Sequence, residues 1–449
     1  MSLNIVIIGA GEVGYNLTRV LSKEDYDITV IDNAPEKCDR VTNNFDARVI
    51  LGNGASQRIL QKIDMENVDY LLALTRVDEI NLVASQISTK LGAKKVICRL
   101  RNTEYLHKIA VVTPADFNIS KVVYPEKAAQ KEIESLIRQS SAVEIQDFFS
   151  GSVLLVGIKL ADSSPLIGRT AKQVEMANPF IPHKLAVVIR DDESFIPHQD
   201  TKYHKDDFVY FVGREDGIPN IQQMSGKPAF KVKNIAILGA GKIGRLLAKS
   251  LQSDYNVRIL EIDEKKAKKY GDQLENALMV IGDGLNTDFL ESENIGEMDC
   301  FIAATEKEQT NILACLLVKH FGVKQVILHI NTTNYIKSVR RIGVDAVVSK
   351  NTAAVNEVIK IIRSDQQSVP VSRFEDIEIE SIELTVSHDC KYLRKKYTIE
   401  KIPENVCLSI IMRDGKARIP DSHIELKVGD KLLFFSKPEH VSIVEELFI

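Results

Sequence analysis

Short apolar segments alternate with longer polar and amphipathic segments along most of the 449-residue chain. Two of these segments, residues 5–8 and 235–238, contain only isoleucine, valine, leucine and alanine, and each leads directly into a glycine-rich segment. Apolar runs of this length are typical of parallel strands that are buried on both faces. Similar runs follow at residues 26–32, 70–74 and 96–98 and at residues 255–261, 300–304 and 326–328. The pattern therefore predicts two parallel sheets whose strands are connected by helices.

The first strand of each predicted sheet leads into the same arrangement of three glycines. The two segments are Gly9-Ala10-Gly11-Glu12-Val13-Gly14 and Gly239-Ala240-Gly241-Lys242-Ile243-Gly244. In a strand–turn–helix segment of this kind, the first glycine permits a tight turn and the second lets a pyrophosphate approach the backbone, while the third lets the helix pack closely on the strand. The free N–H groups at the start of the helix then face the phosphates. Each segment is therefore a candidate nucleotide-binding turn.

An acidic residue ends the second predicted strand of each sheet. This residue is Asp32 in the first half and Glu261 in the second, where Asp263 is an alternative. A carboxylate at this place accepts hydrogen bonds from the ribose hydroxyls and repels the 2′-phosphate of NADP. We therefore expect NAD(H) or an adenosine nucleotide at each site. The alternative for the second copy is a turn whose glycines serve only to pack the helix.

The two halves of the chain match at a constant spacing of 230 residues. The matching residues beyond the glycine turns are Gly52-Asn53-Gly54 with Gly282-Asp283-Gly284, Thr75 with Thr305, Asn81 with Asn311, and Gly92 with Gly322. A second match, between residues 185–191 and 408–414, relates two smaller β-rich segments. Matches at fixed spacing indicate a duplicated structural unit that comprises a large and a small lobe.

The predicted fold is α/β, with two tandem units that each contain a Rossmann-like doubly wound parallel sheet, a connecting helix and a small α+β lobe. The predicted boundaries are 1–125, 126–142 and 143–228 for the first unit and 232–352, 353–369 and 370–449 for the second. The turn-forming segment 226–228 joins the units. Both connecting helices are amphipathic, which is compatible with packing on the sheet of their own unit or with a contact between two chains.

Composition narrows the classes of function. The hydrophobic content of 44% and the charged content of 27% are those of a soluble globular protein, and the net charge of −4 gives no general attraction to nucleic acid. The apolar runs are strand-sized, well short of the ~20 residues of a membrane span. The chain begins without the features of a signal peptide, so we expect a cytoplasmic protein.

The chain offers little of the chemistry that an enzyme requires. Six scattered cysteines lack the spacing of a metal site or a disulfide framework, and we expect each to be a small core residue. Four of the histidines in the small lobes, His183, His198, His204 and His388, have no neighbours that suggest a catalytic base or a metal cluster, and we interpret them as surface residues. We therefore predict no catalytic residue and no metal site. We expect the nucleotide to act as a signal. An NAD-dependent dehydrogenase is the alternative.

The motifs and their tandem order resemble the TrkA family, the cytosolic regulatory subunits of Trk potassium transporters, which contain two RCK units (regulators of potassium conductance). The resemblance covers essentially the whole chain and includes the first glycine turn, Asp32, residues 52–54, residues 75–81 and residues 96–99. It implies that each large lobe binds NAD(H) or ATP/ADP. It further implies a homotetramer whose large lobes form a ring, docked on a membrane-embedded potassium transporter that nucleotides gate. A regulator of another potassium channel or efflux carrier is a further alternative.

The resemblance adds residues to both candidate sites. These are Thr75, Arg76 and Arg99 in the first copy and Thr305 and His329 in the second. The guanidinium of Arg99 suits a phosphate, although a solvated strand end is the alternative. His329 removes the permanent cation from the second copy, whereas Lys242 adds one in place of Glu12. Whether the second copy takes the same ligand is therefore open.

Overall fold

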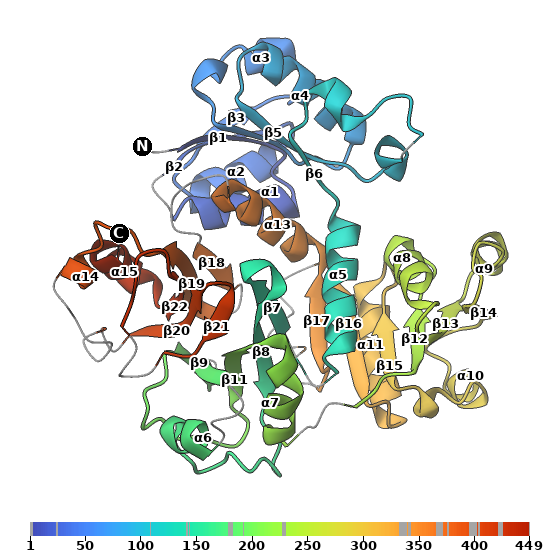
Figure 1. Ribbon diagram of the computed structural model, residues 1–449. Coiled ribbons are helices and arrows are strands. Elements are labelled where there is room, and N and C mark those ends of the chain that lie inside the picture. The colour runs from blue at the N-terminus through green and yellow to red at the C-terminus, as the bar shows by residue number, and fades with distance from the viewer. Residues whose placement is uncertain are drawn as a thin grey trace. The chain divides into compact units, whose positions relative to one another are not determined.

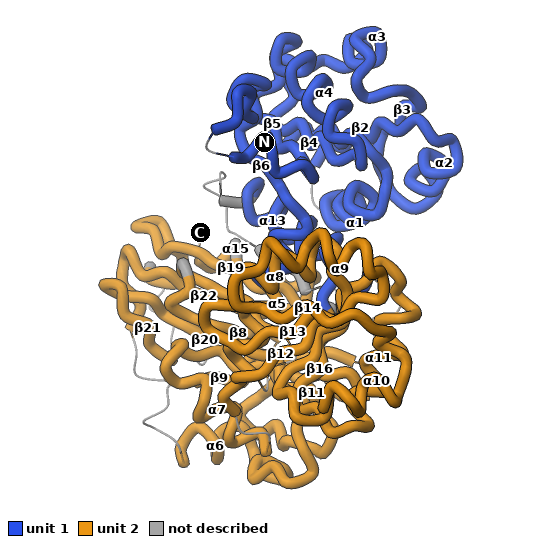
Figure 2. Tube along the Cα trace, turned by 90° about the vertical axis from the view of Figure 1, so that its right-hand side faces the viewer, with its two compact units in different colours: residues 1–131, 330–333, 348–362 blue, residues 132–329, 334–347, 363–449 orange. Residues whose placement is uncertain are grey.

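The computed structural model describes most of the chain. The described residues are 3–23, 26–107, 109–140, 142, 144–177, 183–191, 193–226, 230–331, 339, 343–364, 371–374, 377–394, 402, 405–420 and 425–448. They form two compact units, which consist of residues 1–131, 330–333 and 348–362, and of residues 132–329, 334–347 and 363–449 (Figure 2). The first unit therefore combines the first large lobe with segments from the second half of the sequence.

The first compact unit contains a six-stranded parallel sheet in the order β3-β2-β1-β4-β5-β6 (Figure 1). Its strands are β1 (Leu3–Ile8), β2 (Tyr26–Asp32), β3 (Arg48–Leu51), β4 (Tyr70–Ala73), β5 (Lys95–Arg99) and β6 (Lys121–Val123). The helices between them are α1 (Glu12–Leu21), α2 (Pro35–Asn44), α3 (Gln57–Leu60) and α4 (Asp78–Lys90). Because successive residues of a strand face opposite sides, Ile5 and Ile7 lie in one hydrophobic core and Val6 and Ile8 in another. The strand order reverses between β1 and β4, where doubly wound sheets bind ligands.

The second compact unit contains a matching sheet in the order β14-β13-β12-β15-β16-β17. Its strands are β12 (Asn234–Leu238), β13 (Asn256–Glu261), β14 (Leu278–Ile281), β15 (Cys300–Ala303), β16 (Gln325–Ile330) and β17 (Ala346–Ser349). Its helices are α8 (Lys242–Leu251), α9 (Glu264–Gly271), α10 (Thr287–Ser292) and α11 (Glu308–His320). The prediction of two doubly wound sheets is confirmed, but the outer strands β3, β6, β14 and β17 were not expected.

The same ionic network closes the amino-terminal edge of both sheets. One aspartate accepts hydrogen bonds from a backbone N–H of the first strand and from a lysine Nζ near the fifth strand. The donors are Asn4 and Lys94 for Asp69, at 3.0 and 2.9 Å, and Asn234 and Lys324 for Asp299, at 3.0 and 2.9 Å. These residues also match at a spacing of 230, so the duplication extends to the ends of the sheets opposite the glycine turns.

The connecting helices are α5 (Pro125–Arg138) and α13 (Lys350–Ser364). Although α13 follows the last strand of the second sheet in the chain, its apolar face packs on the first sheet (Figure 1). Its buried residues in that core are Ala354, Val355, Val358, Ile359 and Ile362. The carboxyl-terminal part of α5 contacts the second sheet, where Gln325 Nε2 donates to the carbonyl of Leu136 at 3.0 Å. Of the two alternatives for α13, packing on the sheet of its own half is therefore wrong, and a contact between two chains stays a prediction. Residues 365–369 of this predicted connector lie outside the described residues.

The small lobes each contain a five-stranded sheet, and they share one core in the second compact unit. The first has the order β10-β9-β11-β8-β7, from β7 (Glu144–Phe148), β8 (Val153–Lys159), β9 (His183–Arg190), β10 (Glu193–Phe195) and β11 (Phe208–Gly213), with helices α6 (Ala171–Ala177) and α7 (Ile218–Met224). The second has the order β18-β19-β22-β20-β21, from β18 (Val371–Phe374), β19 (Ile377–Thr385), β20 (Val406–Arg413), β21 (Lys416–Arg418) and β22 (Lys431–Ser436), with helices α14 (Lys391–Arg394) and α15 (Val441–Phe448). The predicted α+β lobes are confirmed. Residues 227 and 228 of the predicted join lie outside the described residues.

One expectation about the small lobes is wrong. His183 is buried, with only 3% of its surface exposed, because it begins β9 and packs against the ring of Phe211. His198, His204 and His388 are exposed, as expected. All six cysteines are buried and free, also as expected. The described residues contain no helix with the length and hydrophobicity of a membrane span, and no cluster of His, Cys, Asp and Glu side chains that could hold a metal ion.

Candidate nucleotide-binding site

The first glycine turn leaves open space where a phosphate would lie. Gly9 has a positive φ of 104°, and its N–H donates to the carbonyl of Ile31 at 2.8 Å. A Cβ atom on Gly14 would lie only 1.8 Å from the carbonyl oxygen of Gly9, so Gly14 is needed for the close packing of α1. A Cβ atom on Gly11 would meet nothing within 4 Å. Gly9 and Gly14 therefore shape the turn, while Gly11 keeps its outer side accessible.

The carboxylate of Asp32 is held firmly at the end of β2. Its Oδ2 accepts a hydrogen bond from the N–H of Ala10 at 2.7 Å, and its Oδ1 accepts one from the N–H of Ala34 at 2.9 Å. The residue is 8% exposed, and Lys37 Nζ lies 3.9 Å from Oδ1. Because a carboxylate has about four acceptor positions, this geometry leaves acceptor capacity for ribose hydroxyls.

Thr75 and Asn81 tie together the carboxyl ends of β4 and β5. The hydroxyl of Thr75 donates to Asn81 Oδ1 at 2.7 Å. The amide of Asn81 donates to the carbonyls of Thr75 and Arg99, at 3.1 and 2.9 Å. The hydroxyl hydrogen of Thr75 is therefore used in a hydrogen bond within the protein. Its hydroxyl oxygen can still accept a hydrogen bond from a ligand.

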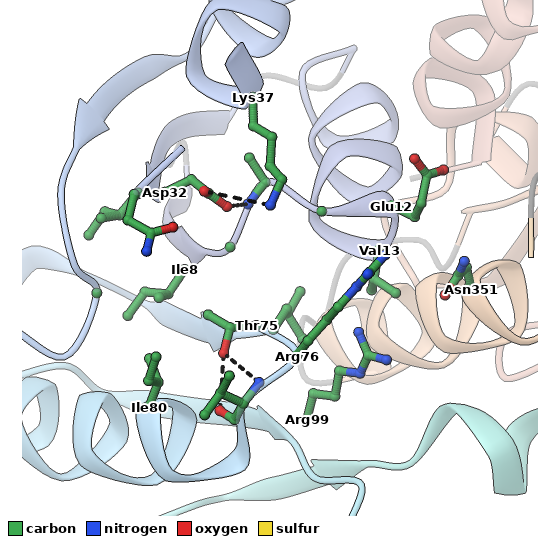
Figure 3. Close-up of a pocket in the computed structure, with 18 of the residues that line it drawn as sticks. Ile8, Glu12, Val13, Asp32, Lys37, Thr75, Arg76, Ile80, Arg99 and Asn351 are labelled. Carbon is green, nitrogen blue, oxygen red and sulfur yellow. Dashed lines mark hydrogen bonds and ion pairs between the residues drawn. The ribbon is translucent and has the colours of Figure 1, made fainter. Parts of the chain in front are cut away.

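The predicted residues of the first copy, except Gly14, line a single pocket of about 700 Å³ (Figure 3). The charged residues of its lining are Lys37, Arg40, Arg76, Arg99, Arg101 and Lys350 on the positive side and Glu12 and Asp32 on the negative side. Six cations minus two carboxylates leave an excess of four positive charges. Such a lining attracts a polyanion.

Arg99 is the most buried cation of this lining, with 6% of its surface exposed. Burial lowers its pKa against the opposing attraction of Glu126, and the neighbouring cations Arg101 and Arg76 lower the pKa further. Its Nε has no hydrogen-bond partner among the described residues. The alternative of a solvated strand end is therefore wrong, and the guanidinium is suited to an anion in the pocket.

Sequence reasoning missed several residues of the pocket. Asn331, Lys350 and Asn351 come from the second half of the chain, and the amide of Asn351 donates to the carbonyl of Asn331 at 2.9 Å. No local sequence pattern predicts these three residues, because they lie at the pocket only as a result of the packing of α13 on the first sheet. Lys37, Arg40 and Arg101 were also missed, although the position of α2 directly after Asp32 could have indicated the first two.

The second glycine turn has the same backbone. Gly239 has a φ of 101°, and its N–H donates to the carbonyl of Leu260 at 2.8 Å. Glu261 Oε2 accepts from the N–H of Ala240 at 2.8 Å, which is the contact that Asp32 makes in the first copy. Asp263 instead caps the start of α9 by accepting from the backbone of Lys265 and Lys266. Glu261, rather than Asp263, is therefore the counterpart of Asp32.

The remaining predicted residues of the second copy also lie at the carboxyl ends of their strands. Thr305 donates to Asn311 at 2.6 Å, and the amide of Asn311 donates to the carbonyl of His329 at 3.0 Å. His329 is buried, with 3% of its surface exposed, and Lys242 begins α8. Both hydrogen bonds repeat those of the first copy. The side chains of Lys242 and His329, in contrast, differ in charge from their counterparts in the first copy.

Two doubly wound parallel sheets, each with a glycine turn and an acidic strand end at its switch point, define a duplicated Rossmann-type protein. The family model of the TrkA-N domain matches residues 5–125 and 235–350, which is more than half of the chain. Trk system potassium uptake protein TrkA homolog 1 of Methanosarcina mazei is 30% identical over 99% of this chain and 100% of its own length. Trk system potassium uptake protein TrkA of Vibrio alginolyticus is 28% identical, over 99% of this chain and 98% of its own length. The chain belongs to the TrkA family.

Solved structures of RCK proteins share the fold. The GsuK RCK domain aligns with the whole chain and 95% of its own length, with a TM-score of 0.59 and 14% identity. The GsuK channel bound to NAD aligns with the whole chain and 79% of its own length, with a TM-score of 0.60 and 14% identity. At this identity the likeness concerns the fold alone.

Proposed function

We propose that this protein is the nucleotide-sensing regulatory subunit of a Trk-type potassium uptake system. The observation that carries the proposal is the pocket at the first glycine turn, which joins an accessible Gly11, a fixed Asp32 and an excess of four positive charges. The names of the full-length TrkA relatives support the link to potassium uptake. In this proposal the nucleotide acts as a signal, and the protein performs no turnover of its own.

The ligand in this proposal is NAD(H), ATP or ADP. The start of α1 and the backbone at Gly11 receive the phosphates, and Asp32 accepts hydrogen bonds from the ribose. The carboxylate of Asp32 disfavours a 2′-phosphate, so NADP is not expected. The GsuK channel, which shares this fold, is a protein whose structure has been solved with NAD.

The partner in this proposal is a membrane-embedded Trk-type transporter, on whose cytoplasmic face a homotetramer docks. Assembly is supported by exposed apolar residues at matching positions of α4 and α11, since Val83 is 44% and Leu313 is 52% exposed. Apolar side chains at equivalent places on two helices suit a repeated contact between large lobes. A nucleotide would gate transport by binding two arrangements of the assembly with different affinity.

Calorimetric titration of the purified protein with NADH, NAD, ATP and ADP tests the binding part of the proposal. We expect at least one of these nucleotides to bind, with NADP binding more weakly than NAD. Failure of all four to bind would contradict the proposal. Adding candidate 2-hydroxy acids with NAD and following the nicotinamide absorbance would reveal a dehydrogenase if hydride transfer occurred.

Potassium uptake measured in cells that express a Trk membrane subunit tests the transport part. We expect uptake to depend on co-expression of this protein. Cells that express an unrelated potassium channel or efflux carrier are the control, and a response of only these cells would assign the protein to a different partner.

A further inference from the structure

The first two helices of the second sheet carry much more positive charge than their counterparts in the first sheet. α8 has three cations and no carboxylate, and α9 has four cations and one carboxylate. In the first sheet, α1 and α2 together have three cations and three carboxylates. Because the two pairs of helices occupy the same places in matching sheets, the fold does not require the excess of positive charge in the second pair.

The lysines of α9 form an exposed basic surface. α8 and α9 lie on the same side of the second sheet (Figure 1), and Arg245 of α8 lies over the ring of Tyr270 of α9 at 3.8 Å. The α9 lysines, all of them exposed, are Lys265, Lys266, Lys268 and Lys269. None of them pairs with Glu261 among the described residues, whereas Lys37 of α2 lies 3.9 Å from Asp32. The charge of α9 is therefore available to a partner outside the protein.

The α9 lysines are placed at a cost to the helix itself. Lys265 and Lys266 lie in its first turn, where the helix dipole favours acidic side chains. Lys265 also precedes Lys269 by four residues, and like charges at this spacing repel each other. Glu264 pairs with Lys268 at 2.5 Å, but Lys265 and Lys266 have no ion pair within the part of the chain that the structure describes. An external anionic surface relieves this repulsion.

Exposed aliphatic side chains flank α9. Ile262, which directly precedes the N-cap residue Asp263, is 66% exposed. Leu278 is 56% exposed and begins β14, the edge strand that packs against α9. The first copy has Asn33 and Arg48 at these two places. Lysines beside exposed aliphatic residues are typical of a surface that binds a membrane, and they distinguish it from one that binds a polyanion through charge alone.

We propose that α9, together with Ile262 and Leu278, binds the surface of a membrane that contains anionic lipids. The lysines meet the headgroups, and Ile262 enters the boundary between the headgroups and the acyl chains. The net charge of −4 of the whole chain has little influence, because salt screens charges beyond about 8 Å. The inference goes beyond the proposed function, because this contact requires neither a nucleotide nor a potassium transporter.

The test is sedimentation of the full-length protein with vesicles that contain no transporter. The vesicles consist of phosphatidylcholine alone or of phosphatidylcholine with about one third phosphatidylglycerol. We expect binding only to the vesicles with phosphatidylglycerol, and loss of this binding at high salt.

Two double variants with the same change of net charge locate the contact. Each lysine near an anionic surface contributes about fivefold to the affinity, so Lys265→Glu/Lys266→Glu should weaken binding by at least about 25-fold. Lys62→Glu/Lys90→Glu alters exposed lysines of the first large lobe and should bind like the unaltered protein. Ile262→Asn introduces the residue of the first copy and should weaken binding severalfold.

Three results would overturn the proposal. They are equal binding to both kinds of vesicle, an equal loss of binding in the two double variants, and tighter binding of a single-stranded oligonucleotide than of the anionic vesicles. The melting temperature shows whether each variant is folded, and Lys268→Glu/Lys269→Glu repeats the test if the first double variant unfolds. Because the assay contains no nucleotide and no transporter, failure of the lipid contact leaves the proposed function untouched.

Discussion

The two glycine turns have nearly the same backbone but different charges. In both, the first glycine has a positive φ, the acidic strand end accepts a hydrogen bond from the alanine N–H, and a threonine donates to an asparagine. The side chains that differ at matching positions include Glu12 and Lys242, Tyr15 and Arg245, Arg40 and Tyr270, and Arg99 and His329. The fold has thus been conserved between the copies while the chemistry offered to a ligand has changed.

An arginine and a tyrosine that exchange places between the copies show most clearly how the fold is kept while the chemistry offered to a ligand changes. Arg40 lies over the ring of Tyr15 at 3.7 Å, and Arg245 lies over the ring of Tyr270 at 3.8 Å. The cation–π contact between the first two helices is therefore kept, with its partners reversed. In the first copy the arginine lies on α2 and lines the pocket, whereas in the second it lies on α8 and donates to the carbonyl of Gly241. Helix packing therefore needs an arginine–tyrosine pair in both copies. The helix that carries the arginine determines whether its charge is offered to a ligand.

The largest expected effect concerns the third glycine, where the copies should behave alike. A Cβ atom at Gly14 or Gly244 would lie 1.8 or 2.0 Å from the carbonyl oxygen of Gly9 or Gly239. We expect Gly14→Ala and Gly244→Ala each to lower the free energy of unfolding by about 2–4 kcal/mol, because backbone must move. Urea unfolding followed by circular dichroism measures this effect. If only one of the two copies tolerates alanine, the two turns are not structurally equivalent.

The acidic strand ends should separate the copies by ligand affinity. Asp32→Ala removes the ribose acceptor, and we expect it to weaken nucleotide binding at the first site by about 1.5–3 kcal/mol. Glu261→Ala removes the equivalent backbone contact in the second copy and is the matched control for stability. Titration of both variants with the same nucleotide makes the comparison. Equal losses of affinity would mean that the turns are two equivalent sites.

Substitution of the second glycine tests the same difference in nucleotide binding between the copies, with a smaller expected effect. A Cβ atom at Gly11 meets nothing within 4 Å, and one at Gly241 meets only the carbonyl of Ala304 at 3.6 Å, so alanine fits the fold at both positions. We expect Gly11→Ala to weaken binding by roughly tenfold to a hundredfold, because the methyl group occupies the approach of the phosphates. Gly241→Ala should leave binding at the first pocket unchanged. If Gly11→Ala binds normally, the phosphates do not approach this turn.

The smallest effect concerns the edge opposite the turns, where the copies should again agree. Burial raises the pKa of Asp69 and Asp299, but hydrogen bonds from a lysine and from backbone N–H groups outweigh it, and each pKa lies below its ordinary value of 3.8. The stabilisation is therefore present above the unfolded pKa and is lost as the pH falls through the lowered pKa.

We accordingly expect Asp69→Asn and Asp299→Asn each to cost about 1 kcal/mol of stability at pH 7 and less at pH 3. Thermal unfolding of both variants between pH 3 and pH 7 provides the measurement. A stability loss that does not shrink in acid would show that the charge of the carboxylate is not its cause.

The sequence was most informative where local chemistry dictates the structure. The glycine turns, their preceding strands and the acidic strand ends follow from steric rules that act within about thirty residues. The constant spacing also led to Thr75 and Asn81, whose hydrogen bond recurs as that of Thr305 and Asn311. The outer strands β3 and β14 were missed because they are four residues long and half exposed, which weakens their apolar pattern.

The parts that could not be predicted depend on contacts between distant segments. The amphipathic pattern of α13 predicts a buried face, but it does not identify the sheet that the face meets. Lys350 and Asn351 could therefore not be assigned to the first site, although they lie beside it in the fold. His183 follows a proline in the sequence and suggested a turn, yet the start of β9 buries it. Tertiary packing decided each of these cases.

The central claim is that nucleotide bound at the first turn controls potassium transport. Its most direct test is potassium flux into vesicles that contain a Trk membrane subunit and this protein, measured with and without the nucleotide found to bind by calorimetry. We predict a nucleotide-dependent flux with the unaltered protein and with Gly241→Ala, and its loss with Gly11→Ala. A flux that responds equally to nucleotide in all three proteins would contradict the account.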